Sequence, residues 1–195
     1  MDLTSITPEP HQLRALSHPV RLRILGLLRS EGPTTATALA TRLGLNSGAT
    51  SYHLRQLAQH GFVEDDAERG NGRERWWRAS AQSTRTEFTT DPEARAAEDA
   101  FVQAVAVVHT EQLQRAVEER ELVPDAWRRA STLSDWGLRL TPRRAEALMT
   151  ALIAAIEETD EDPADEGAED FVVVLHTFPR PGRVARAVPE SEEER

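Results

Sequence analysis

The stretch Asn46–Gly61, NSGATSYHLRQLAQHG, has the features of one complete helix. Asn46 suits the N-cap position, because its side-chain oxygen can accept a hydrogen bond from an amide of the first turn. Gly61 suits the end of the helix, because glycine readily adopts the left-handed conformation that ends many helices. Between them Thr50, Leu54 and Leu57 recur at helical spacing and predict a buried stripe.

The opposite face of this predicted helix carries no carboxylate. Helical geometry places on it Ser47, Gly48, Ser51, Tyr52 and Arg55. Such a face is suited to phosphates and base edges, but an ordinary amphipathic surface helix would show the same periodicity. The flanking sequence has to decide between these alternatives.

The sequence before Asn46 predicts three further helices. The first spans 10–17, and the second begins at Pro19, because the residue that precedes a proline disfavours the helical conformation. A threonine at 34 or 35 caps the third, which ends at Gly44. A tight turn then joins this third helix to Asn46–Gly61, and two short helices joined in this way indicate a helix-turn-helix.

Helical periodicity also predicts which side chains of these helices face the core. In the second helix the expected buried stripe is Val20, Ile24, Leu27 and Leu28. Its arginines are expected to point away from the core: Arg21, Arg23 and Arg29. In the third helix the inward residues are Leu39, Ala40 and Leu43.

A hairpin is predicted after Gly61. Residues 62–64 favour a short strand, 65–72 a polar loop, and 73–79, RERWWRA, a return strand in which one of the two tryptophans faces the core. A helix-turn-helix followed by such a hairpin is a winged helix. The loop is the wing, and the arginines at or near its tip are Arg69, Arg73 and Arg75, with carboxylates beside them that weaken the positive charge.

The charge of the chain is unevenly distributed. The net charge of −10 argues, taken globally, against binding to nucleic acid. However, residues 1–80 hold 10 arginines and 8 carboxylates, whereas the rest of the chain holds 13 and 25. A mildly basic N-terminal part joined to an acidic C-terminal part predicts two domains with different partners. All 23 basic residues are arginine, so arginine counts alone are weak evidence for phosphate binding.

The C-terminal half is predicted to be helical, with a small two-stranded sheet. Long apolar stripes favour helices over 93–121 and 141–158, with a shorter one from 124, and the strands are expected at 138–140 and 171–178. The predicted fold is therefore mainly α, of the α+β class. Its parts are a mobile end at 1–8, a winged helix-turn-helix domain at 10–80, a linker at 81–92, a helical domain at 93–178 and a disordered tail at 179–195.

Four segments, in this order and spacing, resemble the DNA-binding domain of arsenic-repressor-like (ArsR) winged-helix regulators. They are LSHPVRLRILGLL, TATALATRLGL, GATSYHLRQLAQHGFVE and GRERWWRA. The resemblance covers about residues 10–80, and SYHLRQL followed by GFV is its most specific part. The C-terminal half is unlike the small metal sensors of that family and is more similar to the longer winged-helix regulators common in actinobacteria.

This resemblance implies that the helix Asn46–Gly61 enters the major groove of double-stranded DNA and that the wing approaches the minor groove. The residues it assigns to DNA contact are Ser47, Ser51, Tyr52, His53, Arg55, Arg69, Arg73 and Arg75. For His53 a structural role is an open alternative, and for the wing arginines the alternative is solubility. Thr50 is expected in the core despite its hydroxyl group.

No metal, cofactor or catalytic site is predicted. The chain has no cysteine, and its six histidines lack the close spacing of metal ligands. Glycine-rich phosphate loops, nucleophile elbows and HExxH motifs are absent from the sequence, so we expect no enzyme. No apolar run approaches the roughly 18 residues of a membrane span and no signal peptide is evident, which favours a soluble, cytoplasmic protein.

Two functional hypotheses follow. The first is a sequence-specific transcription regulator, a homodimeric repressor on a palindromic operator, with the helix at 93–121 and the C-terminal helices forming the dimer. An unknown small-molecule effector would then occupy an apolar pocket lined by Phe101, Val105, Trp127, Trp136 and Leu148. The second is a winged-helix protein-interaction module whose acidic C-terminal half binds a partner.

Overall fold

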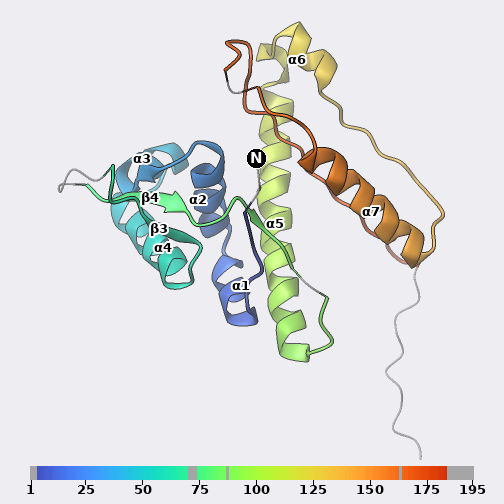
Figure 1. Cartoon of the computed structure of the whole chain (residues 1–195), viewed down its shortest axis with the longest axis horizontal. Coiled ribbons are helices and arrows are strands. Elements are labelled where there is room, and N and C mark those ends of the chain that lie inside the picture. Colours follow the sequence, from blue (N-terminus) through green and yellow to red (C-terminus); the bar gives the residue numbers. More distant parts are fainter. Residues whose placement is uncertain (1–3, 70–73, 87, 163, 184–195) are drawn as a thin grey trace, which may run out of the picture. The chain divides into compact units, whose positions relative to one another are not determined.

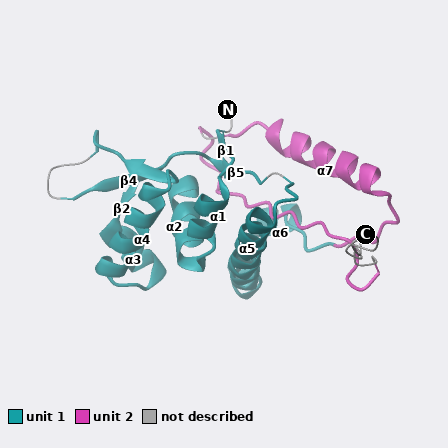
Figure 2. Ribbon diagram, turned by 90° about the horizontal axis from the view of Figure 1, so that it is seen from below, with its two compact units in different colours: residues 1–134 teal, residues 135–195 magenta. Residues whose placement is uncertain are grey.

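The computed structural model describes residues 4–69, 74–86, 88–162 and 164–183 (Figure 1). The chain divides into two compact units, Met1–Ser134 and Asp135–Arg195 (Figure 2). The units therefore separate after α6 (Asp125–Ala130) and not at the linker predicted at 81–92. The described helices are not long and apolar enough to cross a membrane.

Four helices of the first unit form the predicted helical part of the winged domain. They are α1 (Pro10–Leu16), α2 (Pro19–Ser30), α3 (Ala36–Leu43) and α4 (Ser47–Gln59). Each begins at the residue that the sequence indicated, because proline at the first position or a polar cap marks the start of each helix. The turn between α3 and α4 is closed by Gly44, whose φ of 64° is left-handed.

The predicted hairpin is part of a three-stranded sheet. β3 (Val63–Asp65) pairs antiparallel with β4 (Trp76–Ala79), and β4 also pairs antiparallel with β2 (Thr34–Thr35). Sequence periodicity did not indicate β2, because two residues are too few to show alternation. The pairing of Thr35 with Trp76 joins the start of α3 to the base of the wing.

The core of the winged domain lies where α1, α2, α3 and α4 meet the sheet. Thr50, Leu54 and Leu57 are fully buried, as predicted, and Trp77 is the tryptophan that faces the core. In α2 the buried residues are Ile24, Leu25 and Leu28, so the stripe is rotated slightly from the predicted one. The largest fully buried side chains are Phe62, Leu16, Ile24, Leu25, Leu39, Leu54 and Leu57, each of which contributes roughly 1.5–3 kcal/mol by burial.

The sequence predicts that the arginines of α2 point away from the core, but in the structure their side chains are partly buried. Arg29 donates hydrogen bonds to the carbonyl of Ala81 at 2.8 Å and to the hydroxyl of Thr84 at 2.9 Å. Burial lowers the pKa of Arg29 to about 10. Arg23 pairs with Glu111 at 2.8 Å, and the Nε atoms of Arg21 and Arg23 are both buried. The partners come from distant segments, which helical periodicity cannot indicate.

A second small sheet ties the N-terminal end to the segment after the wing. β1 (Ser5–Ile6) pairs parallel with β5 (Ser83–Thr84). The described residues of the predicted mobile end and of the predicted linker are therefore joined to each other by hydrogen bonds.

The long helix α5 (Pro92–Glu118) belongs to the first unit. It packs against α1 and α2, burying Ala97 and Ala104 (Figure 1). Ion pairs between Arg14 and Glu93 and between Arg23 and Glu111 join the same helices. The unit ends after η1 (Arg120–Leu122) and α6 (Asp125–Ala130), and α6 stops before the end near Trp136 and Gly137 that the sequence predicts for this helix.

The second unit contains α7 (Pro142–Glu157), which begins at the predicted Thr141 cap. Residues 138–140 and 171–178 are not strands, so the predicted sheet between them is wrong. A stretch with high β-propensity becomes a strand only when a neighbouring strand pairs with it. Among the described residues, neither stretch pairs with another strand. The five residues of the predicted effector pocket are divided between the units, with Trp136 and Leu148 in the second. Most of the predicted tail lies outside the described residues, which end at 183.

Candidate nucleic-acid interface

Helix α4 is held in place by its cap and by its buried stripe. The Asn46 side chain accepts a hydrogen bond of 2.8 Å from the amide of Ala49. The Thr50 hydroxyl donates to the carbonyl of Asn46 at 3.2 Å, which satisfies a polar group that is fully buried. With Leu54 and Leu57 also buried, the rotation of α4 about its axis is fixed.

The opposite face of α4 is open to solvent. Ser47 and Arg55 are exposed, the side chain of Tyr52 is 53% exposed, and Ser51 is half-buried. Among the residues that the structure describes, Arg55 has no carboxylate partner. This face therefore offers one uncommitted cation and several hydroxyl groups to a ligand outside the chain.

A shallow cleft lies between α4, the first turn of α3 and the base of the wing. Its lining includes Thr35–Thr37 from the start of α3, Ser51 and Arg55 from α4, and Glu74, Arg75 and Trp77 from the wing. The start of α3 carries the positive end of the helix dipole, which attracts anions, although the Thr35 hydroxyl already accepts a hydrogen bond from the amide of Ala38 at 3.2 Å. Sequence analysis did not assign this helix start to the site, although the threonine cap marked its position.

The described arginines of the wing are engaged by the wing itself. Arg75 pairs with Asp65 at 2.7 Å, and its guanidinium lies 4.2 Å from the centroid of the Trp77 ring. Arg69 lies 3.6 Å from the carboxylate of Asp66, which is itself buried. The third wing residue that was predicted, Arg73, lies outside the described residues. The carboxylates beside the arginines thus form ion pairs with two of them.

His53 is half-buried beneath the outward face of α4. Its ring lies 4.8 Å from the ring of His18 and 5.4 Å from that of Tyr52, centroid to centroid. Its Nδ1 atom is buried with no hydrogen-bond partner among the described residues. Burial, together with His18 and Arg21, lowers the pKa of His53. These contacts favour the structural alternative for this residue over direct contact with DNA.

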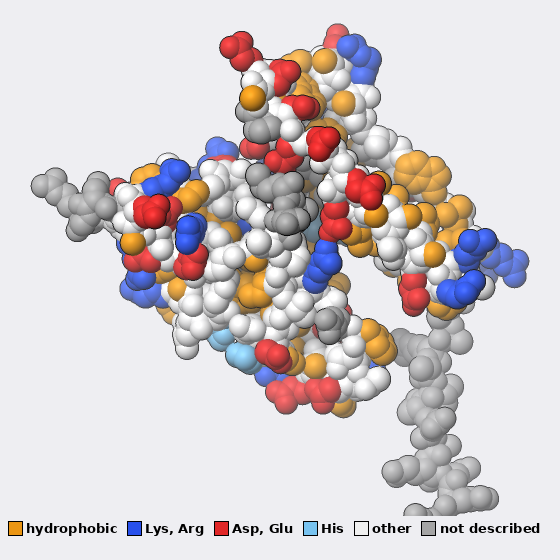
Figure 3. Space-filling view, viewed as in Figure 1, with side chains coloured by type: hydrophobic (Ala, Val, Ile, Leu, Met, Phe, Trp, Pro, Cys, Tyr) orange, Lys and Arg blue, Asp and Glu red, His pale blue; other side chains and the backbone are white. Residues whose placement is uncertain are grey.

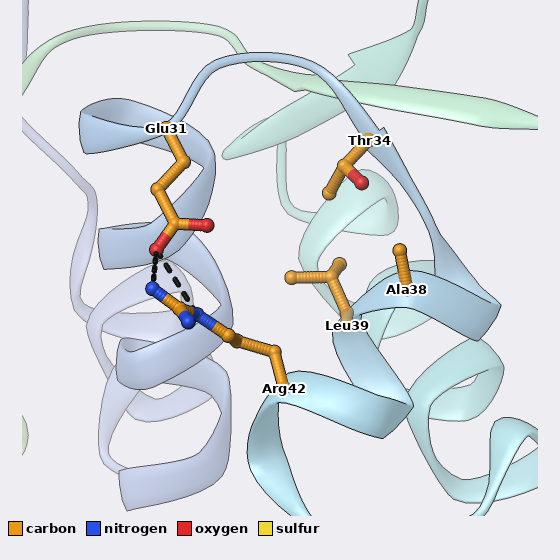
Figure 4. A pocket seen from close by; sticks show the side chains of 5 residues that line it. All are labelled: Glu31, Thr34, Ala38, Leu39 and Arg42. Atoms are coloured by element: carbon orange, nitrogen blue, oxygen red, sulfur yellow. Dashed lines mark hydrogen bonds and ion pairs between the residues drawn. The ribbon is translucent and has the colours of Figure 1, made fainter.

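A second hollow lies between the end of α2 and helix α3, lined by Glu31, Thr34, Ala38, Leu39 and Arg42. Figure 4 shows that Arg42 reaches across it to Glu31, with the ion pair at 2.8 Å. The cation there is neutralised, so this hollow is a poorer anion site than the cleft beside Arg55. Within the described part of the chain, no three histidine or acidic side chains gather closely enough to hold a metal ion.

A helix-turn-helix followed by a hairpin defines the first part of the chain as a winged helix-turn-helix domain. A family model described as a helix-turn-helix domain matches residues 16–66. The HTH-type transcriptional regulator YgaV of Escherichia coli (strain K12) is 41% identical over 59 residues, 29% of this chain. The chain spans about 60% of the length of that curated relative.

Solved structures of winged helix-turn-helix proteins and transcriptional regulators are also similar to the chain. The homodimeric winged helix-turn-helix DNA-binding domain of Mb0332 from Mycobacterium bovis, described as a possible ArsR-family transcriptional regulator, is 31% identical. The match covers 51% of this chain and 79% of that one, with a TM-score of 0.34. The transcriptional repressor BigR from Xylella fastidiosa is 26% identical. That match covers 49% of this chain and 82% of the BigR chain, with a TM-score of 0.31. Residues 16–66 thus match a helix-turn-helix domain, and this part of the chain is similar to an HTH-type transcriptional regulator.

Proposed function

We propose that this protein binds double-stranded DNA through α4 and regulates transcription. The observation that carries the proposal is the outward face of α4, which bears no carboxylate of its own and on which Arg55 is exposed and forms no ion pair among the described residues; Glu74 of the wing lines the same cleft. On this proposal α4 is the recognition helix. Ser47, Ser51 and Tyr52 contact bases or phosphates, and Arg55 binds a phosphate or a guanine.

The cleft beside Arg55 supports a phosphate contact. A DNA backbone that crosses the start of α3 would meet backbone amides, the threonine hydroxyls and Arg55 on one surface. Arg75 lies at the other side of the same cleft, although Asp65 pairs with it in the free protein. We infer that phosphates compete with Asp65 for Arg75 when DNA binds.

Salt dependence and one substitution test DNA binding. A duplex selected from random or genomic fragments is titrated with the full chain at several salt concentrations, with fluorescence anisotropy as the readout. Affinity should fall steeply as salt rises, because bound cations on the phosphates are released. Arg55→Ala should cost about 1–3 kcal/mol of binding free energy, with a flatter salt slope if Arg55 holds a phosphate.

The matched control is Arg143→Ala on α7, which removes the same charge from an exposed site in the other unit. It should leave affinity nearly unchanged. If the two substitutions weaken binding equally, α4 is not the recognition helix. If no duplex is bound at all, the protein-interaction alternative gains support.

We further infer that the protein is a homodimer and that α5 forms part of the interface. Val102, Leu113 and Val117 form an exposed stripe at helical spacing on α5, with side chains 54%, 47% and 47% exposed. Apolar side chains repeated along one helix face favour packing against another helix. A two-fold dimer would place the recognition helices about 34–36 Å apart, in successive major grooves of a palindromic operator. Leu113→Glu should therefore weaken the dimer in sedimentation velocity.

Repression is the regulatory outcome that we propose, since a dimer bound across a promoter would block access to it. A small-molecule effector would regulate such a protein by changing the distance between the two recognition helices. Reporter transcription with and without the protein, from the selected operator, tests the sign of regulation.

A further inference from the structure

Four of the six histidines of the chain gather beside α4, in two pairs of rings. The rings of His18 and His53 lie 4.8 Å apart, centroid to centroid. Those of His11 and His60 lie 5.9 Å apart. Figure 3 shows histidine side chains together at the lower edge of the winged domain. Because imidazoles gain a positive charge on mild acidification, this group can change the charge of the surface near neutral pH.

Arg21, in the first turn of α2, lies within this group of histidines. Burial lowers the pKa of three of them, and the positive charge of Arg21 lowers each further, namely those of His18, His53 and His60. The pKa of Arg21 is itself lowered by burial and raised by the nearby Tyr52. Among the described residues Arg21 forms no ion pair, and its buried Nε atom has no hydrogen-bond partner. The half-buried guanidinium is therefore uncommitted within this part of the chain.

The group also lacks an acidic partner in the part of the chain that the structure describes. Helix α1 contributes His11 to it, and α2 adds the charge of Arg23. Helix α5, which packs against both, brings Glu111 to Arg23, and these two side chains pair at 2.8 Å. No described carboxylate raises the pKa of the three buried histidines. A group of cations without an acidic partner attracts anions from outside the chain.

A DNA duplex would bring phosphates to this side of α4. The major groove is about 12 Å wide, and a helix with its side chains fills roughly 10–12 Å, so a helix in the groove has one phosphate backbone on each flank. The cleft at the start of α3, which Ser51 helps to line, faces one of these backbones on the proposed function. Two residues along a helix point to nearly opposite sides, so His53 and the group around Arg21 mark the other flank.

We propose that Arg21 binds a phosphate of this second backbone, and that the histidines around it strengthen the contact when they are protonated. The inference rests on the DNA binding of the proposed function and extends the interface from α3, α4 and the wing to α2. His53 acts through its charge, since its ring is half-buried. A phosphate nearby favours the charged form of an imidazole, so binding of the duplex takes up protons.

Replacement of Arg21 tests the contact. The selected duplex is titrated with full-length Arg21→Gln, whose Kd should rise about three- to tenfold, while the slope of log Kd against log salt falls by about 1. Arg14→Gln is the matched control, because it removes the same charge from the same unit at an exposed side chain that pairs with Glu93 at 2.8 Å. Circular dichroism verifies that both variants are folded. Equal weakening by the two variants overturns the contact.

Neutral phosphates locate the contact on the duplex. Single methylphosphonates, which remove the charge of one phosphate, are placed along both strands of the selected duplex. At one position the replacement should weaken binding of the parent protein but not of Arg21→Gln, because the variant has already lost that ion pair. If no position behaves in this way, Arg21 binds no phosphate. Coupling of Arg21 to the same phosphate as Arg75 would overturn its place on the second backbone.

The pH dependence of binding tests the histidines. Their pKa values are lowered in the free protein and should rise beside a phosphate, so affinity should increase as pH falls from about 7.5 to about 6. His18→Asn/His53→Gln should flatten this dependence, and asparagine can still cap α2 at position 18. If the double variant responds to pH as steeply as the parent protein, the histidines do not take part.

The failure of this inference can be distinguished from the failure of the proposed function. If Arg55→Ala weakens binding of the duplex and Arg21→Gln does not, α4 remains the recognition helix and the second contact is overturned. If the parent protein binds no duplex, the proposed function and the contact at Arg21 are overturned together.

Discussion

The imidazole of His18, at the N-cap of α2, lies 4.8 Å from the imidazole of His53, in the middle of α4. The two rings join the helix that forms the core to the helix that carries the proposed DNA-contacting face. His18 is held by its cap hydrogen bond, in which Nδ1 accepts from the amide of Val20 at 3.2 Å. Movement of α4 relative to α2 therefore has to break this ring contact.

Acidification should destabilise the protein through this pair. Burial lowers the pKa of His18 and of His53, and Arg21 lowers both further. Below the ordinary histidine pKa of about 6.5 the unfolded chain binds more protons than the folded one, so stability is lost as pH falls through that value. The free energy of unfolding, from urea titrations, should be lower at about pH 5.5 than at about pH 7.5.

Neutral replacements identify the source of this dependence. His18→Asn with His53→Gln should reduce the loss of stability on acidification, although a part should remain because the pKa of His60 is also lowered by burial. If the free energy of unfolding of the double variant depends on pH as steeply as that of the parent protein, other groups cause the loss of stability on acidification.

Removal of the α4 cap should destabilise the winged domain. Asn46→Ala loses the hydrogen bond from the amide of Ala49, and we expect the free energy of unfolding to fall by about 1 kcal/mol. Asn46→Ser keeps an oxygen that can accept this bond and should stay within about 0.5 kcal/mol of the parent protein. Equal destabilisation by the two substitutions would mean that Asn46 acts through something other than its cap.

Two glycines should respond to alanine in opposite directions. Gly44 has a φ of 64°, which alanine adopts at a cost of roughly 1–2 kcal/mol. Gly26 lies within α2, where a Cβ would meet no atom within 4 Å. Gly26→Ala should therefore stabilise the protein by about 0.5–1 kcal/mol, because alanine is the better helix former. The midpoint of thermal unfolding should fall for Gly44→Ala and rise for Gly26→Ala. A Gly44→Ala variant as stable as the parent protein would contradict the left-handed turn at Gly44.

The fold of the winged domain could be predicted because its signals are local. Within one stretch of sequence lie the Asn46 cap, the buried stripe of Thr50, Leu54 and Leu57, and two turn glycines, Gly44 before α4 and Gly61 after it. The structure confirms each of them. The outward positions of Ser47, Tyr52 and Arg55 follow from the same periodicity. Their contact with DNA stays a prediction.

The parts that sequence analysis missed depend on distant partners. The Arg29 side chain points inward because Ala81 and Thr84, more than 50 residues later, accept its hydrogen bonds. α5 belongs to the first unit because its alanines fit against α1 and α2, whereas composition suggested a boundary before it. The predicted strand at 171–178 had the right composition but no ladder within the described chain, since propensity does not supply a partner.

The ion pair between Arg75 and Asp65 leads to a final prediction, a gain in DNA affinity. Asp65→Asn removes the carboxylate that holds Arg75 at 2.7 Å, while the contact with the Trp77 ring at 4.2 Å should keep the guanidinium beside the cleft. An exposed pair of this kind is worth about 0.2–1 kcal/mol, so binding should tighten by up to about fivefold.

Glu64→Gln is the matched control for this gain. It changes the net charge by the same amount and frees Arg78, which pairs with Glu64 at 2.8 Å and does not line the cleft. If Arg75 binds a phosphate, Asp65→Asn should strengthen binding more than Glu64→Gln and should steepen the salt dependence. Equal gains from the two variants would mean that net charge alone is responsible, and that the wing base makes no specific contact with the duplex.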